Sequence, residues 1–281
     1  MENWQASVQQ QLREQDKDLY LASLFMPEGK RSAVQALYAF AADVTRAPFM
    51  VSEAALGEIR LQWWLDTIDG IYDGNVQDSP VAQGLSEAVK LGDLPKHAFL
   101  NLIRAHQFDL YSDPMPALHD LEAYLGETHS SVIQLTAAIL NSDDALECAE
   151  ASGLAGVAYG LASLLRALPY WLSQHSNFIP QDMMVARGID ATKLRDPNFE
   201  AATGVVLAEL REHAMARLMQ ARKSAWTIKA SVKPAFLHVA LTEPYLAVIK
   251  SAGTKISRKP VDIAQWRKQW ILWKAAKTES F

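Results

Sequence analysis

Carboxylates at helical spacing are the first residues of this chain that could carry chemistry. Asp66, Asp69 and Asp73 recur at i, i+3 and i+7, so in a helix over 52–74 they lie on one face. Such a face could hold a divalent cation, because Mg²⁺ prefers oxygen ligands. The same pattern is typical of the solvated side of an amphipathic helix. We favour that second interpretation, because no basic or phosphate-binding motif neighbours the aspartates in the sequence.

Histidines provide a second set of candidates. His106 and Asp109 stand three residues apart and could touch a common ion, but we interpret them as a surface or capped pair, the more frequent role of a lone His-Asp pair. The seven histidines show no ligand spacing such as His-Glu-x-x-His. The single cysteine, Cys148, excludes an internal disulfide framework and suits a reducing compartment.

Composition and periodicity indicate the class of fold that must position these residues. The chain has 281 residues, of which 49% are hydrophobic, enough to bury one sizeable core. Long helical patterns fill most of it, and alternating β-branched runs are almost absent. We therefore predict an all-α fold, with residues 1–281 forming a single domain. No apolar run approaches the roughly 20 residues of a membrane span, and the N-terminus lacks a signal-peptide core, so we expect a cytoplasmic protein.

Small residues mark the stretch 153–182 as a place of close contact. One helical face of it is apolar, and another carries Gly156, Gly160, Ser163 and Ala167. Something must come close to that small face, either a neighbouring helix or a ligand. Pro169 should kink or end the helix.

The same stretch resembles the second signature of the squalene/phytoene synthase family. The family consists of all-α synthases that join two isoprenyl diphosphates head to head. The resemblance covers about residues 15–250 and implies an isoprenoid-synthase-type helical bundle around a central cavity. The matching residues of the signature are Gly156, Ala158, Leu164, Leu165, Arg166, Phe178, Ile179 and Pro180.

Both aspartate-rich motifs of that family are replaced in this chain. Ionisation of a diphosphate needs Mg²⁺ held by carboxylates. The positions that the resemblance assigns to those carboxylates hold Thr45, Arg46, Phe49, Ala167 and Trp171. Arg46 would also repel a metal ion. The resemblance therefore implies no catalytic residue, no bound metal and no cofactor.

Other residues match family positions that line the prenyl cavity or could hold an anion. An arginine suits this role because guanidinium fits phosphate. By resemblance, we assign cavity-lining or anion-binding positions to Arg46, Arg166, Tyr38, Tyr124, Ser131, Gly160 and Ser163.

The resemblance is strongest to a non-catalytic branch of the family, typified by the mitochondrial respiratory complex I assembly factor. Residues 51–53, 59–64 and 165–170 carry it. It implies a protein that acts by binding a protein partner or a prenyl lipid, with no nucleic acid. In a eukaryote it would lie on the matrix side of the mitochondrial inner membrane.

Two alternatives stay open. An active prenyl transferase would need Mg²⁺ and relocated carboxylates such as Asp43, Asp66, Asp69 or Asp182. A prenyl-lipid or quinone binding protein would keep the cavity without the chemistry.

The C-terminal segment 255–281 is basic and rich in tryptophan. From Lys250 onward the chain carries a net charge of +6, whereas the rest carries −11. Trp266, Trp270 and Trp273 form a stripe at helical spacing. We expect this stripe to pack on the helical body as the last core helix. The alternative is that it contacts a partner groove or an anionic membrane surface, which would make the protein peripheral on the inner membrane.

Overall fold

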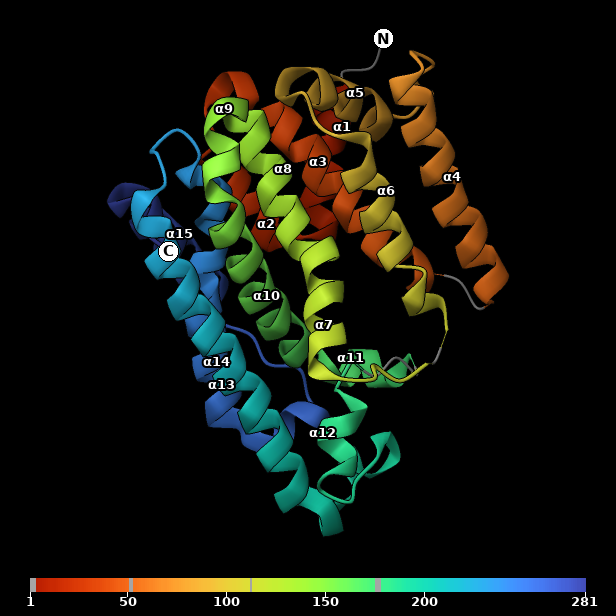
Figure 1. Ribbon diagram of the computed structural model, residues 1–281, viewed down its shortest axis with the longest axis vertical. Coiled ribbons are helices and arrows are strands. Elements are labelled where there is room, and N and C mark those ends of the chain that lie inside the picture. Colours follow the sequence, from red (N-terminus) through yellow and green to blue (C-terminus); the bar gives the residue numbers. More distant parts are fainter. Residues whose placement is uncertain (1–3, 51–52, 112, 175–177) are drawn as a thin grey trace.

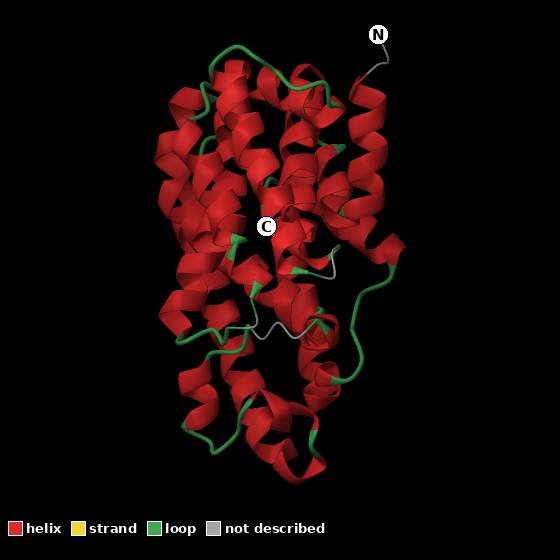
Figure 2. Ribbon diagram, turned by 90° about the vertical axis from the view of Figure 1, so that its right-hand side faces the viewer, coloured by secondary structure: helices red, strands yellow, loops and turns green. Residues whose placement is uncertain are grey.

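Every regular element that the structure describes is helical, which confirms the all-α prediction. The computed structural model describes residues 4–50, 53–111, 113–174 and 178–281. Figure 1 shows the helices packed side by side into a bundle, and Figure 2 shows helix and loop throughout the described chain.

The α-helices follow the chain with short breaks between them. They are α1 Trp4–Gln15, α2 Lys17–Ser23, α3 Glu28–Arg46, α4 Ala54–Tyr72, α5 Pro80–Gly92, α6 Lys96–Ala105, α7 Leu118–Leu125, α8 Ser131–Leu140, α9 Ser142–Ala145, α10 Ala149–Arg166, α11 Leu168–Ser173, α12 Gln181–Val185, α13 Glu200–Ser224, α14 Thr242–Ala252 and α15 Gln265–Thr278. The shorter turns include η1 Ala47–Phe49, η2 Phe108–Leu110, the π-helical turn η3 Gly126–Ser130, η7 Ala225–Thr227 and η8 Lys233–Leu241.

Helix α10 lies at the centre of the packing. It contacts α13, α14, α8, α7, η3 and η8. The stretch Ser142–Arg166 is long and apolar enough to cross a membrane, but 72% of its most apolar window is buried inside the fold, as expected of a core helix. As predicted, the helix ends at Arg166, and Pro169 sits in the first turn of α11, where its missing N–H costs nothing.

The small face of α10 provides the close contact that its sequence predicts. A Cβ at Gly156 would lie 2.4 Å from the backbone of Ser130, and one at Gly160 would lie 2.6 Å from Leu125. The partner is therefore the α7–η3 segment, which can approach because these two positions have no side chain.

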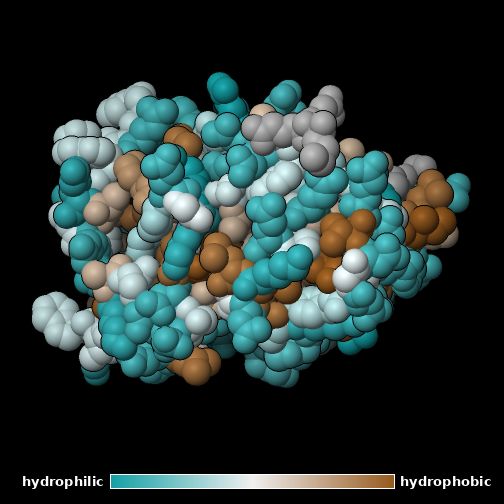
Figure 3. Space-filling view, turned by 90° about the horizontal axis from the view of Figure 1, so that it is seen from above, coloured by the Kyte–Doolittle hydropathy of each residue, from teal (hydrophilic) through white to brown (hydrophobic). Residues whose placement is uncertain are grey.

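Apolar faces turn inward across the bundle. Figure 3 shows hydrophilic side chains over most of the face seen from above, with hydrophobic ones between and beside them. The buried apolar residues form two contiguous clusters, one around α3, α5 and α8 and one around α10, α13 and α14.

Helix α15 contradicts our expectation for the tryptophan stripe. Its buried residues are Lys268, Leu272 and Ala275, which face α2 and η8. The tryptophans lie on the other side of the helix and are exposed. The helix does pack on the body, but through its lysine-containing face.

Substitution at Gly156 tests the close contact of α10 with η3. Gly156→Ala should lower the free energy of unfolding by about 1–3 kcal/mol, because backbone atoms of Ser130 would have to move. Gly153→Ala is the matched control in the same helix, since its Cβ would meet nothing within 4 Å. The control should be neutral or stabilising by up to about 1 kcal/mol. Urea unfolding measures both, and equal effects would contradict the packing described here.

Candidate functional site

A partly open cavity lies between α3 and α10. Its volume is about 220 Å³. Helix α3 contributes Ala41, Ala42, Thr45 and Arg46 to its wall, and the opposite wall comes from the last two turns of α10 with the start of α11. These two helices therefore face each other across the cavity. The volume is smaller than the roughly 300–1,000 Å³ of a typical small-molecule site.

All five residues at the predicted metal-motif positions line this cavity. Thr45, Arg46 and Phe49 approach it from one side, and Ala167 and Trp171 from the other. The rings of Phe49 and Trp171 contact each other with centroids 4.9 Å apart. Where two carboxylate groups would have to face each other to share a metal ion, an aromatic pair spans the gap.

A buried polar network lies beside Thr45. The Nδ1 atom of His106 is 2.6 Å from Oδ2 of Asp109, and its Nε2 atom is 3.2 Å from Oγ1 of Thr45. The hydroxyl of Tyr124 donates to the same Asp109 oxygen at 2.9 Å. Our interpretation of His106 and Asp109 as a surface pair is wrong, because both side chains are buried and line the cavity. Sequence spacing identified the pair but not the neighbours that remove it from water.

The other histidines in the wall are uncharged at neutral pH. Burial, with smaller contributions from His106 and His238, lowers the pKa of His129 to about 3. Burial likewise lowers the pKa of His238 to about 4. The hydroxyl of Thr128 lies 3.0 Å from Nδ1 of His129. The cavity wall therefore offers hydrogen bonds from neutral rings on this side, not charge.

Two carboxylates line the cavity, and both already have partners. Asp109 belongs to the network with His106 and Tyr124. Asp16 caps α2 by accepting hydrogen bonds from the backbone N–H groups of Asp18 and Leu19. Within the described residues there is no group of three or more His, Cys, Asp or Glu side chains that could hold a metal ion. The residues present do not fit a Mg²⁺-diphosphate site.

Asp16 is a carboxyl of the cavity wall with a raised pKa. Burial, and next the neighbouring Asp18, raise its pKa to about 6. The backbone N–H groups at the start of α2 and the Arg166 guanidinium act in the opposite direction but do not outweigh burial. Sequence reasoning missed this residue, although an Asp before a helix is a recognisable N-cap signal.

Arg166, which we predicted to hold an anion, lines the cavity, but its guanidinium is paired with carboxylates of this chain. Its Nη1 lies 2.9 Å from Asp262 and its Nη2 lies 3.4 Å from Asp18. Its guanidinium also stacks over the Tyr245 ring at 4.1 Å. Lys268 joins the same group, 2.9 Å from Asp18 and 3.0 Å from Asp262. Both cations are therefore neutralised by carboxylates of this chain.

The residues that the resemblance assigned to the cavity fall into two groups in the structure. Tyr124, Ser163, Arg46 and Arg166 line the cavity. Three do not. Tyr38 is buried in the first core cluster, and Gly160 packs on Leu125. Ser131 bonds to the carbonyl of Glu127. In each case the side chain, or its absence, serves helix packing instead of the cavity.

The aspartates of α4 lie on its exposed side, as we favoured. Asp66 accepts a hydrogen bond from Gln62 at 2.7 Å, and Asp69 pairs with Lys96 at 3.0 Å. Asp73 follows the last turn of the helix.

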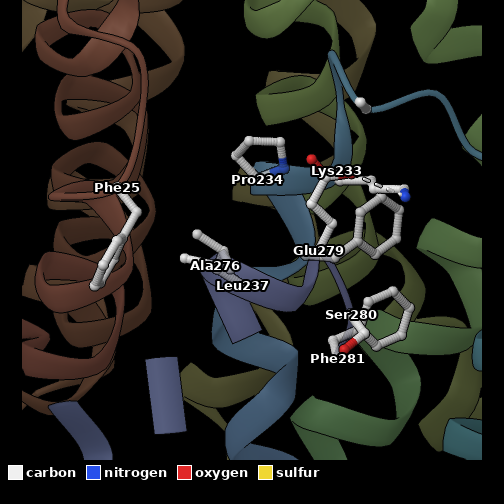
Figure 4. Close-up of a pocket in the computed structure, with 10 residues that line it drawn as sticks. Phe25, Lys233, Pro234, Leu237, Ala276, Glu279, Ser280 and Phe281 are labelled. Atoms are coloured by element: carbon white, nitrogen blue, oxygen red, sulfur yellow. Dashed lines mark hydrogen bonds and ion pairs between the residues drawn. The ribbon is translucent and has the colours of Figure 1, made fainter. Parts of the chain in front are cut away.

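A smaller cavity of about 120 Å³ lies near the C-terminal residue, away from both predicted motifs. Figure 4 shows Phe281 and its neighbours there, with the Lys233–Glu279 ion pair beside it. The Phe281 ring stacks on Phe236 with centroids 5.1 Å apart. This cavity is the space left around the packed Phe281 ring.

Comparison with known proteins gives relatives named as assembly factors and relatives named as phytoene synthases. The family profile described as squalene/phytoene synthase matches residues 12–273. Assembly factor 6 of NADH dehydrogenase (ubiquinone) complex I from Homo sapiens is 32% identical over 239 residues, covering 85% of this chain and 72% of that protein. A phytoene synthase from Thermus thermophilus is 27% identical over 221 residues, covering 76% and 72%.

Solved structures support the fold. A dehydrosqualene synthase in complex with ligand superposes with a TM-score of 0.80 at 17% identity, covering 98% of this chain and 95% of that chain. The similarity confirms the predicted isoprenoid-synthase-type bundle.

The pH dependence of stability tests the raised pKa of Asp16. From about pH 4 to pH 6 the folded carboxyl keeps a proton that the unfolded one has lost, so its contribution to stability falls as the pH rises. Asp16→Asn keeps the cap acceptor and should remove this fall. At pH 7 the variant should exceed wild type by on the order of 1 kcal/mol or more.

Asp190→Asn is the control for this experiment. Asp190 also caps a helical turn, but hydrogen bonds from Thr192 lower its pKa. Its contribution is present above the ordinary Asp pKa and lost as the pH falls, so this variant should lose stability at pH 7. Thermal unfolding from pH 4 to pH 8 measures both, and parallel curves for the two variants would contradict the assignment.

Proposed function

This chain belongs to the squalene/phytoene synthase family, and we propose that it acts there by binding instead of by catalysis. The observation that carries the proposal is the wall of its cavity. The positions matched to both aspartate-rich motifs hold no carboxylate, and two of them, Phe49 and Trp171, are in ring contact. Without carboxylates to hold the ion, the leaving diphosphate has nothing to neutralise it.

Relocated carboxylates do not rescue the catalytic alternative. Asp43 accepts a hydrogen bond from the Trp64 indole at 2.9 Å. Asp66 and Asp69 are exposed on α4, and Asp182 is exposed at the start of α12. None of these four is among the described residues that line the cavity. The alternative of a prenyl-lipid or quinone ligand has the cavity in its favour, but a volume of about 220 Å³ is small for such molecules.

The role that we propose is assembly of a respiratory NADH dehydrogenase. The human relative at 32% identity is named as an assembly factor of that complex. A protein that assists assembly must present a surface to a partner protein. We assign this surface to α4, which stands at the right-hand edge of the bundle in Figure 1.

Helix α4 carries an unpartnered apolar stripe. Leu56, Ile59 and Trp63 are exposed at i, i+3 and i+7. Asp66 lies three residues after Trp63 and Arg60 three residues before it, so an acidic and a basic side chain border the stripe. This arrangement suits a protein partner with an apolar face and charged side chains of both signs at its edge.

An activity assay tests the non-catalytic part of the proposal. With farnesyl or geranylgeranyl diphosphate, Mg²⁺ and NADPH, the protein should form no phytoene, squalene or prenylated cyclopropyl diphosphate above a no-enzyme control. The phytoene synthase from Thermus thermophilus is the positive control. Product formed by this chain would overturn the proposal.

Complementation tests the binding part. In cells of the source organism that lack this chain, assembled NADH dehydrogenase should fall severalfold and recover with the wild-type chain. Ile59→Glu should fail to restore it, because a charge enters the apolar stripe. Met219→Glu should restore it, since Met219 on α13 is 63% exposed and Ile59 is 64% exposed.

Two outcomes of this experiment would count against us. Normal NADH dehydrogenase in cells without the chain would refute the assembly role. Full recovery with Ile59→Glu would refute α4 as the partner surface.

A further inference from the structure

Helix α15 leaves an aromatic face uncovered by the rest of the fold. Trp266, Trp270 and Trp273 are 71%, 59% and 45% exposed. The rings of Trp270 and Trp273 stack on each other, with centroids 5.1 Å apart and planes 23° from parallel. Stacked indoles standing in water bury far less area than tryptophan buries in a core, and such side chains are typical of interfaces that are apolar on one side and wet on the other.

This face is held outward by the packing of the opposite one. Lys268 is buried against Asp18, with Leu272 and Ala275 one and two turns further on. Turning the tryptophans inward would pull Lys268 away from its two carboxylates and expose the leucine. The tryptophans are therefore a fixed surface of the folded protein and not part of a loose tail.

The basic charge of the segment is also left uncompensated on this side. The two acidic residues of the segment already form ion pairs. Asp262 pairs with Arg166 and Lys268, and Glu279 pairs with Lys233. Arg267, Lys274 and Lys277 are exposed on α15 and form no ion pair with any residue that the structure describes. Three tryptophans thus share one short helix with cations that lack an anion.

We propose that this face binds an anionic membrane surface, with α15 lying in the plane of the headgroups. The indoles would sit at the headgroup level, and the three exposed cations would meet lipid phosphates. A membrane fits better than a protein groove because the tryptophans project from a convex helical surface, and a bilayer needs no matching pocket. The helix has 14 residues, too few to span a bilayer.

This surface and the α4 stripe lie on different sides of the bundle. Figure 1 shows α15 on the left and α4 on the right. A protein docked on a membrane through α15 would keep α4 free. The inference does not depend on the proposed function, because a catalytic protein could dock in the same way.

Vesicle binding tests the inference directly. The full chain should co-sediment with vesicles of phosphatidylcholine mixed with phosphatidylglycerol, and much less with phosphatidylcholine alone. Binding should weaken as salt rises, because exposed charges are screened. Changing Trp266, Trp270 and Trp273 together to Gln, or Lys274 and Lys277 together to Glu, should each lower the partition coefficient about tenfold or more.

Matched controls distinguish binding through this face of α15 from non-specific adsorption to the vesicles. The triple change of Leu56, Ile59 and Trp63 to Gln removes a comparably exposed apolar stripe on α4. The double change Arg60→Glu and Lys90→Glu alters net charge equally but away from α15. Both controls should bind vesicles like wild type. Thermal unfolding of every variant should match wild type, because all these side chains are exposed or partly exposed.

Three results would overturn the proposal. One is failure of the wild-type chain to sediment with the anionic vesicles. Another is loss of binding in the α4 controls equal to that in the α15 variants. The third is capture of an acidic protein that depends on the α15 tryptophans while vesicles are ignored, which would assign the face to a protein partner.

Discussion

A buried group of charges around Asp18 holds together parts of the chain that are far apart in sequence. Its carboxylate accepts hydrogen bonds from the Tyr245 hydroxyl at 2.5 Å and from Lys268 at 2.9 Å, and Arg166 lies 3.4 Å away. Asp18 lies in α2, and these partners come from α14, α15 and α10. Removing Lys268 would leave the buried carboxylate with only Arg166 and the Tyr245 hydroxyl, and breaking a buried ion pair typically costs about 3–5 kcal/mol. The geometry of the cavity and the orientation of the last helix both follow from this group.

The effect on the cavity comes through Arg166 and Asp16. Because Arg166 is bound by Asp18 and Asp262, its charge is not free to meet a ligand phosphate. Asp16 stands two residues before Asp18. Burial, and next the charge of Asp18, raise the pKa of Asp16 to about 6. On the other wall, neutral histidines and the His106–Asp109 network replace ionic ligands with hydrogen bonds. A cavity of this kind is small, and it lacks the carboxylate set that Mg²⁺ requires.

The effect on the outer surface comes through Lys268. Burying this lysine commits one face of α15 to the body and leaves three tryptophans outside. Helix α4 offers a different kind of surface, an apolar stripe with charged side chains of both signs at its edge. The fold thus presents two chemically distinct faces, one basic and aromatic and one apolar. Both faces suit the proposed role in binding.

Local patterns in the sequence determined much of this. Helical periodicity gave the all-α class, the small residues Gly156 and Gly160 predicted a close helix contact, and the motif positions from Thr45 to Trp171 were predicted to converge on a cavity. These properties depend on residue type and short spacing, or on a family resemblance that spans the chain. Tertiary structure alone decided the burial of His106 and Asp109, because spacing does not show which neighbours will exclude water. It also decided the orientation of α15, whose sequence offers either a tryptophan face or a lysine face to the core. Asp18, 250 residues away from Lys268 in the sequence, determines the orientation. Leaving its buried carboxylate without Lys268 would cost more free energy than burying another indole would gain.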